Sequence, residues 1–118
     1  MDQFKKRIEK IYGYCKSLAQ KEEIPISKNI RNITINTRTK KRLGCCKLIG
    51  KSITGKRLYE IEISYSMKEA SDKKLEEIML HELIHTCPGC MNHGTRWKAY
   101  VKRLNEKYGY GISTTVKG

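Results

Sequence analysis

Apolar side chains recur at steps of three and four residues near the start of the chain, which is the spacing of one helix face. Lysine and arginine occupy many of the positions between them. Pro25 cannot continue a helix, because its ring removes a backbone donor and clashes with the preceding turn. We therefore predict an amphipathic helix over residues 2–22. Its apolar face comprises Phe4, Ile8, Ile11, Tyr12, Cys15, Leu18 and Ala19.

Three segments in the middle of the chain have the character of β-strands. Residues 30–36 alternate between apolar and polar positions, and residues 44–50 form a short run bounded by glycines. Residues 57–65 alternate most regularly, and a turn at residues 54–56 precedes them. Since the connections are short, we predict a small antiparallel meander with one face on the helices.

Two more helices are predicted in the second half of the chain. From Lys73 to His85 apolar residues occur nearly all round the second half of the segment, which is typical of a helix buried on most sides. Ser71 or Asp72 would be its N-cap. Residues 96–107 form a further helix, and the last ten residues are expected to be strand-like or frayed. This element order predicts an α+β fold.

Composition adds a strong positive charge to this picture. The 118 residues include 25 Lys and Arg against 12 Asp and Glu, for a formal net charge of +13. A field of this size favours a polyanionic partner, and nucleic acid is the one we expect. The densest basic stretch, residues 37–42, is either a solvated turn or a site of phosphate contact. Its four cations are our candidates for DNA binding: Arg38, Lys40, Lys41 and Arg42.

Neither a membrane span nor export is predicted. No run of about 18 apolar residues exists, and no apolar stretch of the secretory type follows the basic N-terminus. The five cysteines are an odd number, so we interpret them as reduced thiols or metal ligands rather than as disulfides. These features predict a cytoplasmic protein, which DNA binding would place at a nucleoid or in a nucleus.

All three histidines of the chain fall within thirteen positions. His81 and His85 are four residues apart on a predicted helix, so they project from one face and can hold one zinc ion. His93 is the remaining histidine that can act as a third ligand, which leaves a fourth position for water. The pKa of that water would fall to about 7, and Glu82 would take its proton and pass it to a leaving amine. Three histidines without a metal are the alternative.

The segment His81-Glu82-Leu83-Ile84-His85, followed by His93-Gly94-Thr95-Arg96-Trp97, resembles the SprT-like domain, which includes Spartan-type proteases. The pattern of that family is HExxH, a loop, and His-Gly-x-x-aromatic at the start of another helix. Residues 37–46 are similar to the basic stretch and the glycine that precede the second strand of the family. Residues 61–64 are similar to its third strand.

The resemblance implies a single SprT-like domain over residues 1–118, with the minimal gluzincin-like architecture of a zinc metalloprotease. One Zn²⁺ would be bound by His81, His85 and His93, and Glu82 would be the catalytic base. Spartan-type members cleave proteins crosslinked to DNA, with DNA as the activator, so the implied role is repair of DNA–protein crosslinks. The strand that ends near Ser64 would be the edge that pairs with an extended substrate backbone.

Two features depart from the family pattern. The loop before His93 is short and carries Cys87 and Cys90. A structural zinc there needs two more ligands, and none is well placed. A redox pair and a thiolate that caps the catalytic zinc are further options, with packing of the loop as the default. The second departure is that no zinc ribbon or other DNA-binding module follows, so DNA contact would come from this domain's own surface.

A function of another class therefore stays open. The chain would then be a basic nucleic-acid-binding module with a structural, non-catalytic zinc. Glu82 discriminates between the two functions, because only the peptidase needs a base beside the metal. The sequence does not choose an oxyanion donor among the candidates Arg96, Tyr59 and Tyr65.

Overall fold

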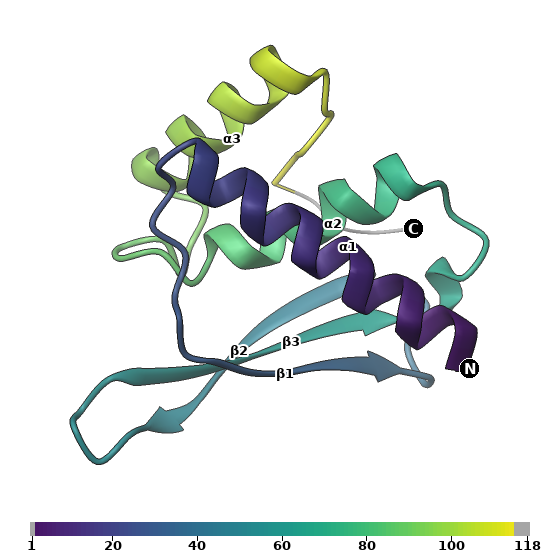
Figure 1. The fold of residues 1–118 in the computed structure, drawn as a ribbon, viewed down its shortest axis with the longest axis horizontal. Coiled ribbons are helices and arrows are strands. Elements are labelled where there is room, and N and C mark those ends of the chain that lie inside the picture. The colour runs from purple at the N-terminus through teal and green to yellow at the C-terminus, as the bar shows by residue number, and fades with distance from the viewer. Residues whose placement is uncertain (1, 115–118) are drawn as a thin grey trace.

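The computed structural model describes residues 2–114, in which two helices lie on one face of a three-stranded sheet and a third helix packs on the second of them (Figure 1). The α+β class and the predicted element order are confirmed, with every bound within one residue of its prediction. In chain order the elements are α1 (Asp2–Lys21), β1 (Ile30–Asn36), β2 (Gly44–Lys51), β3 (Arg57–Ser64), the 3-10 helix η1 (Tyr65–Met67), α2 (Asp72–Ile84) and α3 (Thr95–Tyr108).

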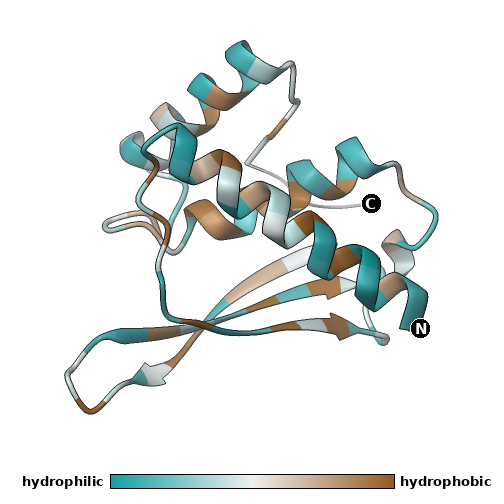
Figure 2. Cartoon of the chain, in the orientation of Figure 1, coloured by the Kyte–Doolittle hydropathy of each residue, from teal (hydrophilic) through white to brown (hydrophobic). Residues whose placement is uncertain are grey.

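The core lies between the helices and the sheet. Helix α1 buries the predicted face, apart from the half-buried Tyr12, and α2 buries every residue from Ile78 to Ile84. Figure 2 shows apolar stretches recurring along both helices and along the strands. The side chain of Ser71 accepts a hydrogen bond from Lys74 N at 3.1 Å, so it is the N-cap that fixes where α2 begins. None of the helices within residues 2–114 has the length and hydrophobicity to cross a bilayer.

The strand order differs from the prediction. The order is β1-β3-β2, with β1 parallel to β3 and β2 antiparallel to it, so the predicted antiparallel meander is wrong. Residues 37–43 arch over the end of β3, where Ser64 N donates to Leu43 O at 2.9 Å and Ser64 Oγ donates to Thr39 O at 2.6 Å. Apolar and polar residues alternate most regularly in β3. Its place at the centre of the sheet buries Ile61 and Ile63 completely.

This order also overturns the prediction for the substrate-binding edge. Both sides of β3 are paired, so the strand that ends at Ser64 offers no free backbone groups to a peptide. The unpaired edges of this sheet belong to β1 and to β2.

The segment after α3 is neither a strand nor frayed over the residues that the structure describes. Gly109 caps α3 with a φ of 71°, a left-handed conformation that glycine adopts without strain, and the chain turns back. Gly111 N then donates to Glu77 Oε2 at 2.7 Å, and the backbone of Ile112 exchanges two hydrogen bonds of 2.9 Å with the Asn105 side chain. The prediction for residues 115–118 lies outside the described residues.

Candidate metal centre

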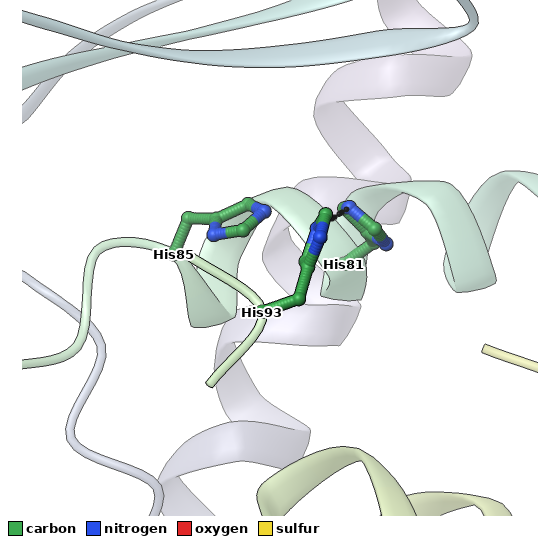
Figure 3. A group of neighbouring side chains, drawn as sticks. All are labelled: His81, His85 and His93. Carbon is green, nitrogen blue, oxygen red and sulfur yellow. Dashed lines mark hydrogen bonds between the residues drawn. The ribbon is translucent and has the colours of Figure 1, made fainter. Parts of the chain in front are cut away.

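Helix α2 and the loop before α3 bring the three histidines together (Figure 3). The ring nitrogens of His81, His85 and His93 that can act as ligands lie within 4.8 Å of one another, and Nε2 of His81 is 3.1 Å from Nε2 of His93. Tetrahedral zinc with Zn–N bonds of about 2.0–2.1 Å requires its nitrogens to be about 3.3 Å apart. The cluster therefore fits one zinc ion with little rearrangement.

Backbone carbonyls orient the two histidines that come from α2. Nδ1 of His81 donates to Ser113 O at 2.8 Å, and Nδ1 of His85 donates to Cys90 O at 2.7 Å. A carbonyl oxygen only accepts, so Nδ1 carries the proton in both rings. Nε2 is then the unprotonated nitrogen of each neutral ring, which is the form that binds a metal.

Burial keeps these rings neutral. His81 is 2% exposed and His85 8% exposed. Desolvation, with a smaller contribution from His85, lowers the pKa of His81 to about 4, although the bond to Ser113 opposes this. Burial also lowers the pKa of His85 and of His93. Few protons therefore compete with a metal for these nitrogens at neutral pH.

Trp97, in the first turn of α3, packs against all three imidazoles. Its ring centroid is 4.8 Å from that of His81, 5.6 Å from that of His85 and 4.6 Å from that of His93. Its Nε1 donates to His81 O at 3.4 Å. The family resemblance included Trp97 as the aromatic residue of its motif but predicted no contact between Trp97 and the metal centre. The aromatic position of His-Gly-x-x-aromatic was the signal that could have assigned it to the metal centre.

Glu82 is a buried carboxyl group beside this cluster. It is 3% exposed, and its Oε2 has no hydrogen-bond partner among the described residues. Oε2 lies 3.9 Å from His81 Nε2, the nitrogen that faces the cluster. Burial raises the pKa of Glu82 to about 8, while the positive charge of Arg42 lowers it. An unpaired buried carboxyl group next to neutral imidazoles is complementary to a cation and a water molecule.

A cleft of about 770 Å³ opens in front of the cluster. The start of β2 and the loop that follows β1 form its other walls. Of the four cations proposed to contact DNA, Lys41 and Arg42 line the cleft, whereas Arg38 and Lys40 do not, and all four are exposed. The sequence did not connect this basic loop with the metal site. None of the candidate oxyanion donors lines the cleft; these were Tyr59, Tyr65 and Arg96.

Gly44, at the start of β2, is a residue of the site that the sequence did not single out for this role. A Cβ at this position would lie 2.8 Å from Ile78 Cγ2 and 3.0 Å from Glu82 Oε2. Helix α2 therefore approaches β2 so closely, next to Glu82, that a side chain has no room. A glycine that opens a strand with no turn requirement was the available signal.

Cys87 and Cys90 pack in the loop between the second and third histidines. Both belong to the hydrophobic core, and Cys90 N donates to Cys87 O at 3.1 Å across a turn in which Gly89 has a φ of 73°. Within residues 2–114, the only group of three or more side chains placed to share a metal is the histidine cluster. The structural-zinc option therefore finds no support among the described residues, and the burial of both thiols fits packing of the loop, the default interpretation.

The fold and the histidine cluster define a protein class. A pair of histidines of the HExxH type on a buried helix, with a third histidine from the next loop, suggests a metalloprotease. The chain belongs to the SprT-like family, because the model of that family matches residues 2–117. No solved structure matches the chain.

Proposed function

We propose that this protein is a zinc-dependent endopeptidase whose SprT-like domain spans the whole chain. The observation that carries the proposal is the convergence of three neutral imidazoles beside the unpaired Oε2 of Glu82. His81, His85 and His93 would hold one Zn²⁺. Three protein ligands leave one coordination position for solvent or substrate, as in catalytic rather than structural zinc sites.

Each residue of the cluster then has a defined task. A zinc ion bound there supplies Lewis-acid polarisation of the scissile carbonyl and acidifies a water molecule. Glu82 accepts the proton of the attacking water through Oε2 and later donates it to the leaving amine. The bonds to Ser113 O and Cys90 O hold the two α2 imidazoles in position. Trp97, which is 1% exposed, excludes water from the inner side of the cluster.

The outer edge of β2 is where we place the substrate backbone. The cleft is lined by Gly44, Cys45 and Cys46 at the start of this strand, beside Glu82 and the histidines. β2 pairs with β3 on one side, and its other side is an edge of the sheet. An extended peptide that adds to this edge would pass its carbonyls in front of the cluster.

We further propose that the protein substrates are bound or crosslinked to DNA. The net charge of +13 supports a polyanionic partner. Arg38 and Lys40 are exposed on the loop that forms the cleft wall, without lining the cleft themselves, so they can contact phosphates next to it. DNA affinity should fall steeply with salt, and replacing both residues with Gln should flatten the log–log slope by about 1 for each lost contact. A flat salt response in the wild type would count against phosphate contact.

Replacing Glu82 with Gln tests the peptidase. We expect Glu82→Gln to bind zinc at the wild-type stoichiometry and to lose cleavage of an unfolded, DNA-bound protein, whereas His93→Ala should lose zinc. Metal analysis and gel assays with and without DNA measure both effects. Equal cleavage by wild type and Glu82→Gln would refute the role of Glu82. A zinc-loaded wild type that never cleaves would favour a nucleic-acid-binding module with a structural zinc.

A further inference from the structure

We propose that Lys41 and Arg42 form a carboxylate-binding subsite in the wall of the metal cleft. The subsite would select substrates with a carboxylate near the scissile bond, either an Asp or Glu side chain or a free C-terminus. The proposal rests on the proposed peptidase function. It assigns to these two residues a role other than phosphate contact.

The loop that carries the two cations is held in place by its own hydrogen bonds. Asn36 Oδ1 accepts from Arg38 N at 2.8 Å and from Thr39 N at 3.2 Å. Ser64 Oγ donates to Thr39 O at 2.6 Å, and the side chain of Leu43 is buried in the core. Lys41 and Arg42 therefore project from a fixed wall of the cleft, which a subsite requires.

The acidic groups of the cleft form no close ion pair with either cation, although the charge of Arg42 acts to lower the pKa of Glu62 and of Glu82. Glu62 accepts from Asn36 Nδ2 at 2.7 Å and from Lys47 Nζ at 3.0 Å, so both of its oxygens are engaged. Neither Lys41 nor Arg42 takes part in an ion pair within residues 2–114. The Arg42 guanidinium donates to Cys45 Sγ at 3.4 Å, and a thiol is a weak acceptor.

A guanidinium with uncommitted donors matches a carboxylate. Its fork of N–H groups binds both oxygens of one carboxylate, and a neighbouring lysine adds positive charge. The cleft also contains Glu62 and Glu82, so a chain of phosphates would meet two carboxyl groups there. A peptide that carries one carboxylate brings a single negative charge to the two cations, so it meets less of this repulsion than a chain of phosphates, and it can follow the edge of β2. The observations therefore favour a polypeptide carboxylate over nucleic acid at this position.

The test measures peptide binding separately from cleavage. Zinc-loaded Glu82→Gln protein is titrated with fluorescent peptides of one length that contain either Glu or Gln next to the central bond, each with an amidated or a free C-terminus. Glu peptides should bind about tenfold more tightly than Gln peptides, since a hydrogen bond to a charged group is at stake. The same gain on freeing the C-terminus of the Gln peptide would identify the terminal carboxylate as the ligand.

Variants of the loop locate the effect. Arg42→Gln in the same background should abolish the preference, and Arg42→Glu should reverse it toward peptides with Lys at that position. Arg38→Gln is the matched control, because Arg38 shares the loop but does not line the cleft, and it should retain the full preference. Circular dichroism confirms that each variant is folded.

Three results would overturn the subsite. The first is equal affinity for Glu and Gln peptides with no gain on freeing the C-terminus. The second is an equal loss in Arg38→Gln and Arg42→Gln. The third is a loss of DNA affinity in Arg42→Gln with an unchanged peptide preference. Failure of the proposed function is distinguishable, because the wild type would then cleave none of the peptides. A preference for Glu peptides that depends on Arg42 would still support the subsite in that case.

Discussion

Replacing Gly44 with Ala probes the contact that sets Glu82 against the sheet. The new Cβ would lie 2.8 Å from Ile78 Cγ2, whereas ordinary contact begins at 3.4 Å, so one of the two must move by about 0.6 Å. The same atom would lie 3.0 Å from Glu82 Oε2. Both partners belong to α2, so the relief is a shift of this helix or of the Glu82 side chain.

The expected cost follows from these distances. Inserting a methyl group into a packed core costs about 1–3 kcal/mol, which lowers Tm by roughly 4 °C per kcal/mol for a chain of this size. A displacement of 1 Å at a catalytic group costs about 100-fold in rate, so a shift of half that size should lower kcat about tenfold. Zinc stoichiometry should stay at the wild-type value, because Gly44 does not crowd a histidine.

Urea unfolding, metal analysis and peptide cleavage measure the three effects, and Gly13→Ala is the matched control. Gly13 lies in α1, and a Cβ added there would meet no atom within 4 Å, so alanine at this position should stabilise the protein by about 1 kcal/mol. In a double-mutant cycle with Glu82→Ala, part of the cost of Gly44→Ala should disappear. A Gly44→Ala protein as stable and active as the wild type, or a cycle without coupling, would refute this reasoning.

Three further predictions concern the metal centre. A chain ending at Tyr108 loses the Ser113 carbonyl that orients His81, so its zinc affinity should fall about 10–100-fold. A chain ending at Thr114 is the control and should keep the wild-type zinc affinity. The fluorescence of the single tryptophan measures zinc binding. The metal-free protein should lose stability to urea as pH falls from 6.5 toward 4, because unfolded His81 takes up a proton before the folded form, whose pKa is about 4. Burial raises the pKa of Glu82 to about 8, so metal-free Glu82→Gln should gain stability over the wild type as pH rises from 4.5 to 8. A constant difference across that range would contradict the last prediction.

The helices and the pairing of His81 with His85 could be predicted because side-chain periodicity encodes them directly, whereas His93 could be assigned as the one histidine left. The apolar face of α1 and the i,i+4 spacing of His81 and His85 each follow from 3.6 residues per turn. The order of the strands could not be predicted, because the alternation of apolar and polar residues identifies the two faces of a strand but not its neighbouring strands. That order depends on the loop of residues 37–43, which passes over Ser64 so that β3 can lie between the other two strands.

The basic loop of residues 37–42 shows that charge, like alternation, does not determine the position of each residue in space. The sequence counts four cations in residues 37–42, but it does not state which of them face the cleft. The turn made by Asn36 and Thr39 decides this, and it separates Lys41 and Arg42 from Arg38 and Lys40. Net charge therefore predicts that an anion binds, while the local hydrogen bonds determine where each cation is available.

The Cys-Pro-Gly-Cys loop lies between two histidines of the cluster, and backbone hydrogen bonds hold two of the rings in position. His85 is oriented by the backbone carbonyl of Cys90, and His81 by that of Ser113. A carbonyl is present whatever the side chain is, so these positions can change in sequence as long as the path of the chain is kept. The path at Cys90 depends on the left-handed conformation of Gly89 and on the bond from Cys90 N to Cys87 O. The backbone turn is thus what the metal site requires of this loop, and the side chains of Cys87 and Cys90 pack in the core.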